Sequence, residues 1–202
     1  MRNIKTPHQQ KGVALGVILG AIALIAAIGF ALVSGSRQTT TNTATEKTKL
    51  DAAALMTQGV NLRDGVTRML SNGVDVSTIT ADATAATGLY HPTDGGAVQQ
   101  TAPPQAITTA TDWAIGDVRA NAVGTSAGDD FIVYMGNITE TVCGVINTQL
   151  RGDSTIPAAG VALADFATGT AADLSAVAGA SSEACVEETG GAYVYYTVVA
   201  AT

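Results

Sequence analysis

The feature that most restricts how this chain can fold is an unbroken apolar stretch over residues 13–33, VALGVILGAIALIAAIGFALV. None of its residues is charged, and as a helix it would rise about 31 Å, which matches the hydrocarbon core of a bilayer. A helix also satisfies its own backbone hydrogen bonds, as lipid requires. Arg2, Lys5 and Lys11 precede the stretch without an acidic residue. We therefore expect the amino terminus to stay in the cytoplasm and the carboxyl-terminal part to be exported.

Three fates of this stretch fit the sequence. A cleaved secretory signal has a shorter apolar core, of about 7–15 residues, followed by small residues, and Val33-Ser34-Gly35 offers only a poor cleavage site. A signal anchor that is never cleaved fits the length. The third fate follows from Lys11-Gly12, which stands directly before the stretch. This arrangement resembles the prepilin class of signal, in which a membrane peptidase cuts after the glycine and the apolar helix is retained.

The charge balance beyond the leader limits the classes of partner. From residue 13 onward the chain has 7 basic and 17 acidic residues, a net charge of −10. Such a surface repels phosphate backbones, so we expect no direct nucleic-acid binding. The sequence divides into a basic leader (1–12), a transmembrane helix (13–36), a polar linker with an amphipathic helix (37–73) and an exported globular domain (74–202).

An amphipathic helix is predicted directly after the Thr-rich segment 38–49. That segment is a juxtamembrane linker by composition, or else it continues the membrane helix into the next one. The apolar residues that recur at roughly helical spacing are Leu50, Ala53, Ala54, Val60, Val66, Met69 and Leu70. Asn72-Gly73 is the predicted end of this helix, and Gly59 and Gly65 weaken the pattern.

The remainder reads as loops, strands and one further helix. The predicted order is a loop at 74–110, a short strand through 113–115, a strand over 130–135 ended by Gly136-Asn137, a helix over 139–150, a weakly patterned stretch at 153–182 and a strong strand over 192–200. Thr139 is the candidate N-cap of the helix, and Gly152 lies just past its end. The order predicts an α+β fold, with a long N-terminal helix packed on a small antiparallel sheet.

The two cysteines, Cys143 and Cys185, predict one disulfide, because a small even number in an exported chain is typical of a disulfide pair. A pair of free buried thiols is the alternative. A bond that closes the intervening residues would restrict the unfolded chain by about 4 kcal/mol on the entropy model.

Together these features resemble a type IV pilin or a pilin-like subunit. Residues 142–147, VCGVIN, are similar to the V-C-x-x-I-N pattern of some bacterial pilin-like proteins, in which a Tyr-rich strand also follows a late cysteine, as residues 193–196 do here. The resemblance implies cleavage between Gly12 and Val13 and assembly into a helical filament through the apolar helix. It implies a prepilin peptidase and the pilus assembly machinery as partners. The subunit would lie in the inner membrane before assembly and on the cell surface afterwards.

Two details of the apolar helix bear on assembly. Gly16 and Gly20 form a small-x-x-x-small pair that would let another helix approach closely. Major subunits of the family usually carry Glu at the fifth mature position, where this chain has Val17. The ion pair that such a Glu can form with a neighbour's amino terminus is therefore missing. The chain is a minor, tip or divergent subunit, or its filament aligns without that pair, or the prepilin interpretation is wrong.

No group of residues in the sequence predicts catalysis, a metal site or a cofactor. His8 lies in the leader, and His91 beside Pro92 is expected to be an exposed loop residue. The acidic pairs 129–130 and 187–188 are expected to be solvated turn charges, and the triplet 137–139 matches an N-glycosylation acceptor. We therefore expect a non-enzymatic structural protein. The alternatives are a single-pass anchored envelope protein with a binding domain, and a secreted domain released by signal peptidase.

Overall fold

The computed structural model describes residues 43–119, 130–167, 172–174 and 182–200. The chain divides into two units, residues 1–46 and 47–202. Of the first unit only residues 43–46 are described, and they are helical. The predicted leader and membrane helix, with Gly12, Val13, Gly16, Val17 and Gly20, lie outside the described residues.

A long helix opens the described part of the chain and covers residues 43–71. It takes in residues 43–49 of the Thr-rich segment, whose composition suggested a linker. It ends where the sequence predicts, because Gly73 has a φ of 85° and its N–H donates to the Leu70 carbonyl oxygen over 2.9 Å. A left-handed glycine after the last turn is a common helix stop, since glycine has no Cβ to clash there.

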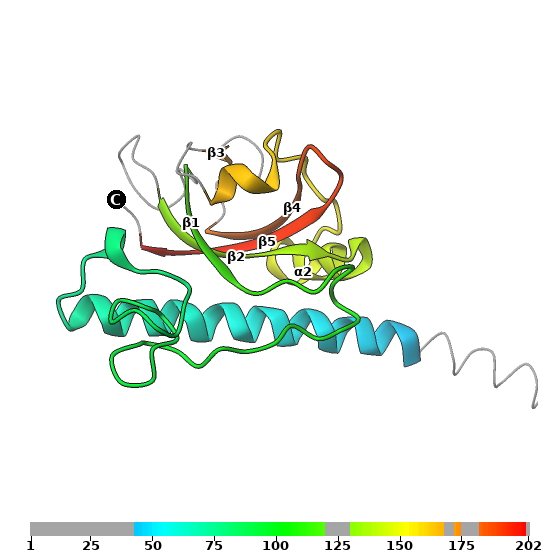
Figure 1. The fold of residues 1–202 in the computed structure, drawn as a ribbon. Helices are drawn as coiled ribbons and strands as arrows, with labels where there is room; N and C mark the ends of the chain where they lie inside the picture. The colour runs from blue at the N-terminus through cyan, green and yellow to red at the C-terminus, as the bar shows by residue number, and fades with distance from the viewer. Residues whose placement is uncertain (1–42, 120–129, 168–171, 175–181, 201–202) are drawn as a thin grey trace, which may run out of the picture. The chain divides into compact units, whose positions relative to one another are not determined.

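The sheet has five strands in the order β3-β1-β2-β5-β4. The strands are β1 (Ala114–Arg119), β2 (Asp130–Ile138), β3 (Ala172–Asp173), β4 (Glu183–Glu187) and β5 (Tyr193–Ala200). Four of them pair antiparallel, and only the two-residue β3 runs parallel to its neighbour β1. Figure 1 shows the long helix running beneath this sheet, with helix α2 (Glu140–Arg151) on the same side. The unit therefore has an α+β fold.

The central strand β2 does not end at Gly136-Asn137, as the sequence predicts, but continues to Ile138. Its register against β5 shifts between Met135 and Ile138, and Asn137 has a φ of 56°. The pair Gly-Asn therefore forms a bulge inside the strand and not a turn after it, and the same two residue types suit both.

Two further local predictions need correction around β2 and α2. Asp130, predicted as a solvated turn charge, is the first residue of β2 and only 3% exposed. Thr139 does stand at the N-cap of α2, but its side chain makes no capping hydrogen bond. The carboxyl end follows the prediction, because Gly152 has a φ of 76° and its N–H bonds the Thr148 carbonyl oxygen. The stretch 153–182, which showed little pattern, contains the 3-10 helix η3 (Leu163–Phe166) and strand β3.

Each face of the sheet has its own apolar core, because side chains alternate between faces along a strand. The core on the helix side joins the long helix and α2 to the sheet and includes Leu55, Leu62, Met69, Val133, Met135 and Ile146. The core on the other face lies under residues 159–167 and Leu174, and it includes Ile132, Tyr134, Phe166, Leu174 and Tyr196. Both faces of the sheet are thus covered in the described part of the chain.

The buried face of the long helix agrees only in part with the predicted one, since Val66 and Met69 are buried as predicted but other members are not. Leu50 is 69% exposed, Val60 is 38% exposed, and Ala53 is also exposed. Leu55 and Leu62, which the predicted face omits, are buried. The predicted set mixed residues from two sides of the helix, and it left out the two glycines, which lie on the buried side.

Gly59 and Gly65 are contact points of the helix and not weaknesses in it. A Cβ added to Gly59 would lie 3.0 Å from the hydroxyl oxygen of Tyr195, and one added to Gly65 would lie 2.8 Å from the Cβ of Ala97. These distances leave no room for a side chain. Gly59 therefore lets β5 approach the helix backbone closely, and Gly65 does the same for the loop that contains Ala97.

Candidate functional site

The long helix carries an exposed uncharged strip on the side opposite its buried face. The exposed residues between positions 50 and 60 are Leu50, Ala53, Thr57 and Val60, which are spaced three or four residues apart. We call these four residues the outer strip. A surface helix normally places charged or polar residues opposite its core-facing side. An exposed strip without charge is therefore suited to contact with another apolar surface.

Buried polar contacts fix the rotation of the helix that leaves the outer strip exposed. The Gln58 side chain accepts a hydrogen bond from the Trp113 indole Nε1 over 2.9 Å. Its amide Nε2 donates to the Thr101 carbonyl oxygen over 3.0 Å. A rotated helix would leave these buried groups without partners, which is costly. The helix is therefore held in one orientation on the sheet.

A second buried polar contact lies beside Gly59, where the Tyr195 hydroxyl donates to the Glu183 carboxylate. Burial raises the pKa of Tyr195 well above its ordinary value, and the nearby Glu183 charge adds to the effect. The phenol is therefore a neutral donor at physiological pH. Its ring also packs edge-on against Trp113, with the ring centroids 5.8 Å apart. The contact joins β5 to β4 on the side of the sheet that faces the long helix.

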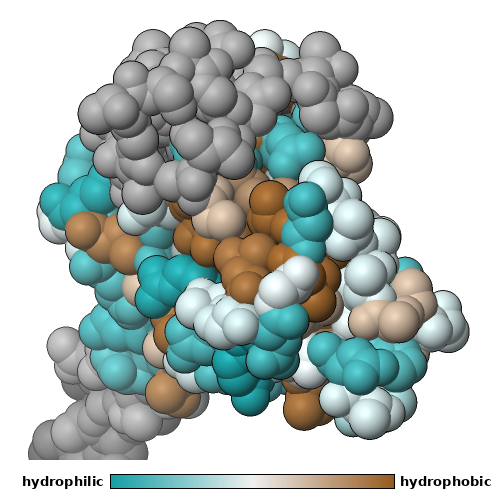
Figure 2. Space-filling model, turned by 90° about the vertical axis from the view of Figure 1, so that its left-hand side faces the viewer, coloured by the Kyte–Doolittle hydropathy of each residue, from teal (hydrophilic) through white to brown (hydrophobic). Residues whose placement is uncertain are grey.

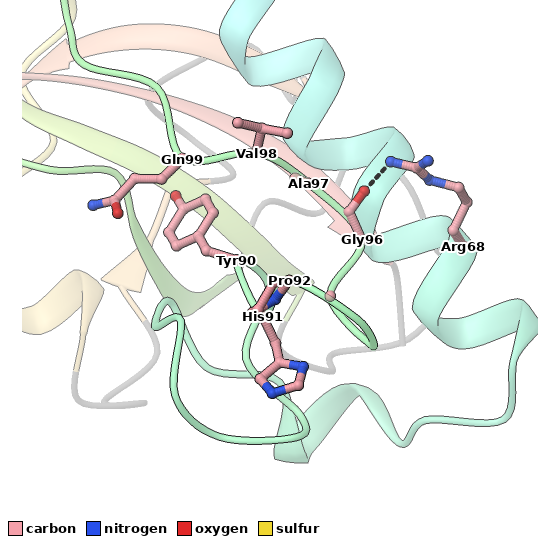
Figure 3. Close-up of a pocket in the computed structure, with 9 residues that line it drawn as sticks. Arg68, Tyr90, His91, Pro92, Gly96, Ala97, Val98 and Gln99 are labelled. Carbon is pink, nitrogen blue, oxygen red and sulfur yellow. Dashed lines mark hydrogen bonds between the residues drawn. The ribbon is translucent and has the colours of Figure 1, made fainter.

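A hollow of about 470 Å³ lies where the loop after residue 88 meets the last turns of the long helix. Figure 3 shows Arg68 on one side, with its guanidinium donating to the Gly96 carbonyl oxygen, while the His91 ring points away from it. Val98, which is 79% exposed, and Tyr90 also line the hollow. Figure 2 shows the end of the unit seen from the left of Figure 1, where hydrophobic residues gather between hydrophilic ones.

Tyr90 and His91 are two titratable side chains that line this hollow. Burial raises the pKa of Tyr90 to about 12, with a smaller contribution from the charge of Asp112, so its hydroxyl stays protonated near neutral pH. His91 is 22% exposed and not a free surface residue, because its Nδ1 lies 3.2 Å from an Asp94 carboxylate oxygen and 3.2 Å from the Asp94 backbone nitrogen. Among the described residues there is no group of His, Cys, Asp and Glu side chains that could hold a metal ion.

The predicted disulfide is confirmed between Cys143 and Cys185, with the two Cα atoms 5.4 Å apart. It joins helix α2 to the edge strand β4, across 42 positions of sequence. The alternative of two free thiols is therefore wrong. Both residues are fully buried, in the core on the helix side of the sheet.

The acidic pair at 187–188 is partly buried and structural. Glu188 accepts hydrogen bonds from the backbone N–H groups of Gly190 and Ala192, and these bonds lower its pKa. In the triplet 137–139, the Asn137 side-chain amide donates to the Thr111 hydroxyl, and Ile138 between the two sequon residues is buried. The acidic pair is therefore not the solvated turn charge that the sequence predicted, and the sequon lies in a packed part of the chain.

One residue of the VCGVIN segment, to which the sequence analysis gave no structural role, is central to this corner. Asn147 lies in α2 and is fully buried. Its side-chain amide makes hydrogen bonds to Cys185 in β4 and to Thr155 in the segment that follows α2. The signal for it was present in the VCGVIN segment, where a polar residue stands four positions after a cysteine on the apolar face of a helix. Buried polar residues at such positions need partners, and their partners define the packing.

No helix within the described ranges is long and apolar enough to cross a membrane. Comparison with protein-family models gave no match, and neither the curated proteins nor the solved structures gave one.

Proposed function

We propose that this chain is a structural subunit of a type IV pilus-like extracellular filament, assembled through its apolar N-terminal segment. The observation that carries the proposal is the outer strip, a run of exposed uncharged residues on the long helix between the exposed charges of Glu46 and Asp64. It follows in sequence the apolar stretch 13–33, for which water is a poor solvent. Both features need a partner that covers them, and further copies of the same chain supply one.

Hydrophobic burial is the physical basis of this assembly. Covering an exposed Leu or Val side chain fully contributes about 1.5–3 kcal/mol, at roughly 25 cal/mol per Å² of apolar surface. Leu50 and Val60 are the two large apolar residues that the helix exposes. Since Val17 stands where the family usually has Glu, subunit alignment in this proposal depends on apolar packing over the length of the helix.

The proposal includes a processing route. A prepilin peptidase removes residues 1–12 between Gly12 and Val13, and the apolar helix holds the subunit in the inner membrane until the assembly machinery extracts it. The protein has no catalytic role, takes no cofactor and does not bind nucleic acid directly. Gly16 and Gly20 allow close helix contact in the filament core.

The outer strip provides a direct test in the cells that produce the protein. Leu50→Arg and Val60→Arg place a charge on exposed positions, so the unit should still fold while filament contacts are lost. We expect filaments sheared from the cell surface to fall at least tenfold for each variant, measured by electron microscopy and by quantifying the subunit in the sheared fraction. Val98→Arg is the matched control, because Val98 is more exposed than either residue and lies outside the outer strip, on the loop beside the last turns of the helix.

Two results would contradict the proposal. Filament yields that are equal for Leu50→Arg, Val60→Arg and Val98→Arg would remove the outer strip from assembly. A protein that stays in the membrane fraction as a monomer, with residues 1–12 attached, would favour the single-pass envelope protein with a binding domain instead.

A further inference from the structure

The buried amide of Asn147 holds the same residue that the disulfide holds. Its Oδ1 accepts a hydrogen bond from the Cys185 backbone N–H over 3.0 Å, and its Nδ2 donates to the Cys185 carbonyl oxygen over 2.8 Å. The same Nδ2 donates to the Thr155 carbonyl oxygen over 3.1 Å. One side chain thus joins helix α2, the segment after it and strand β4.

These bonds replace a missing neighbour strand. β4 is an edge strand, and its inner side pairs with β5. On its outer side the N–H and carbonyl of Cys185 point away from β5, and the Asn147 amide satisfies both in the way that a paired strand would. Two residues further on, Glu187 bonds the Pro157 carbonyl oxygen and the Ala159 N–H, so the outer side is also paired there. An edge strand with its backbone groups paired is fixed in place.

The spacing of Cys143 and Asn147 in α2 brings the disulfide and the Asn147 hydrogen bonds to the same residue, Cys185. Cys143 and Asn147 are four positions apart in α2, so both side chains lie on one face of the helix. Both contact Cys185, one through sulfur and one through the backbone. The Asn147 contact involves no sulfur atom, so it is available to the reduced chain as well.

We propose that Asn147 is a positioning residue for disulfide formation, which aligns Cys185 with Cys143 in the folded but still reduced protein. The bond is then the last step at this corner and not the cause of its fold. In that step the two thiols give up two protons and two electrons and form one S–S bond. An external disulfide oxidant, such as glutathione disulfide, takes them up as its own S–S bond breaks into two thiols.

The alignment of Cys185 with Cys143 in the reduced protein can be measured as the effective concentration of one thiol relative to the other. The full-length protein in detergent is equilibrated in glutathione redox buffers, the free thiols are alkylated, and the oxidised fraction is read by mass spectrometry. We expect Asn147→Ala to lower the effective concentration about tenfold or more, because the hydrogen bonds that fix β4 are lost. Gln58→Leu is the matched control. It removes buried hydrogen bonds elsewhere and destabilises the oxidised and reduced forms alike, so the value should not change.

An unchanged effective concentration in Asn147→Ala would overturn the proposal, because the rest of the fold would then align the thiols. If that variant fails to fold, hydrogen exchange on the Cys143→Ser/Cys185→Ser double variant decides. Protection of the amide at residue 185 comparable to that in the oxidised protein supports the proposal. Exchange of that amide at the rate of an exposed group, with β5 still protected, refutes it. Both outcomes are independent of whether the protein forms filaments.

Discussion

Replacing Gly96 with alanine puts a methyl group where the backbone of the long helix already lies. The added Cβ would be 1.9 Å from the Gly65 carbonyl oxygen and 2.3 Å from its carbonyl carbon. Neither atom can move without bending the helix, so the loop must lift. Lifting it also separates the Gly96 carbonyl oxygen from the Arg68 guanidinium that donates to it.

The expected loss follows from these two effects. Overpacking costs about 1–3 kcal/mol. The hydrogen bond contributes about 1 kcal/mol, toward the low end for a charged donor because Arg68 is exposed to solvent. A loss of about 3 kcal/mol should lower the Tm by about 6–12 °C in a unit of this size. Gly65→Ala should lower the free energy of unfolding by less than Gly96→Ala does, since its Cβ would stay 2.8 Å from its nearest contacts.

Thermal unfolding of the full-length protein, followed by circular dichroism, measures both losses. Gly144→Ala in α2 is the control, because its Cβ would lie 3.4 Å from the Ser154 carbonyl oxygen, an ordinary contact. That variant should keep or slightly raise the Tm, since alanine is the better helix former by about 1 kcal/mol. A Gly96→Ala protein that melts with the wild type would refute the close contact between loop and helix.

Two further predictions concern the polar contacts of the unit. Gln58→Leu leaves the Trp113 indole N–H buried without an acceptor and should lower the free energy of unfolding by about 2 kcal/mol. Urea unfolding, followed by the fluorescence of this single tryptophan, tests the prediction, and an unchanged midpoint would count against the contact. Asp82 accepts hydrogen bonds, first from the Ala85 N–H, that hold its pKa below the ordinary 3.8, so its stabilising effect is complete above that pH and disappears as the pH falls through the lower folded value. Urea midpoints measured between pH 6 and pH 2 should therefore fall less steeply for Asp82→Asn than for the wild type, and equal slopes would contradict this.

Local signals in the sequence were sufficient where one element's pattern decides its structure. The final strand, the helix after Thr139 and the stop at Gly152 follow from β-branched and aromatic content, apolar spacing and a left-handed glycine. The disulfide followed from the cysteine count and the expected export. In these places no distant part of the chain competes with the local preference.

The sequence was misleading where tertiary contacts decide. Gly59 and Gly65 read as weak points of a helix, although they mark its closest contacts, and only the partner segments reveal this. Asp130 reads as a turn charge because its burial depends on strand pairing. Asn147 is recognisable in the sequence only as part of the VCGVIN segment, and its structural role is not, because its partner Cys185 lies 38 positions away. A pattern within one element cannot report the atoms that another element brings to it.

If the chain is a filament subunit of this kind, the apolar stretch is kept and the leader is removed, and the intact mass of the native protein tests this most directly. We expect a chain that starts at Val13, with or without a methyl group on its amino terminus. A mass that begins at Met1, or one that begins near Ser36, would contradict it.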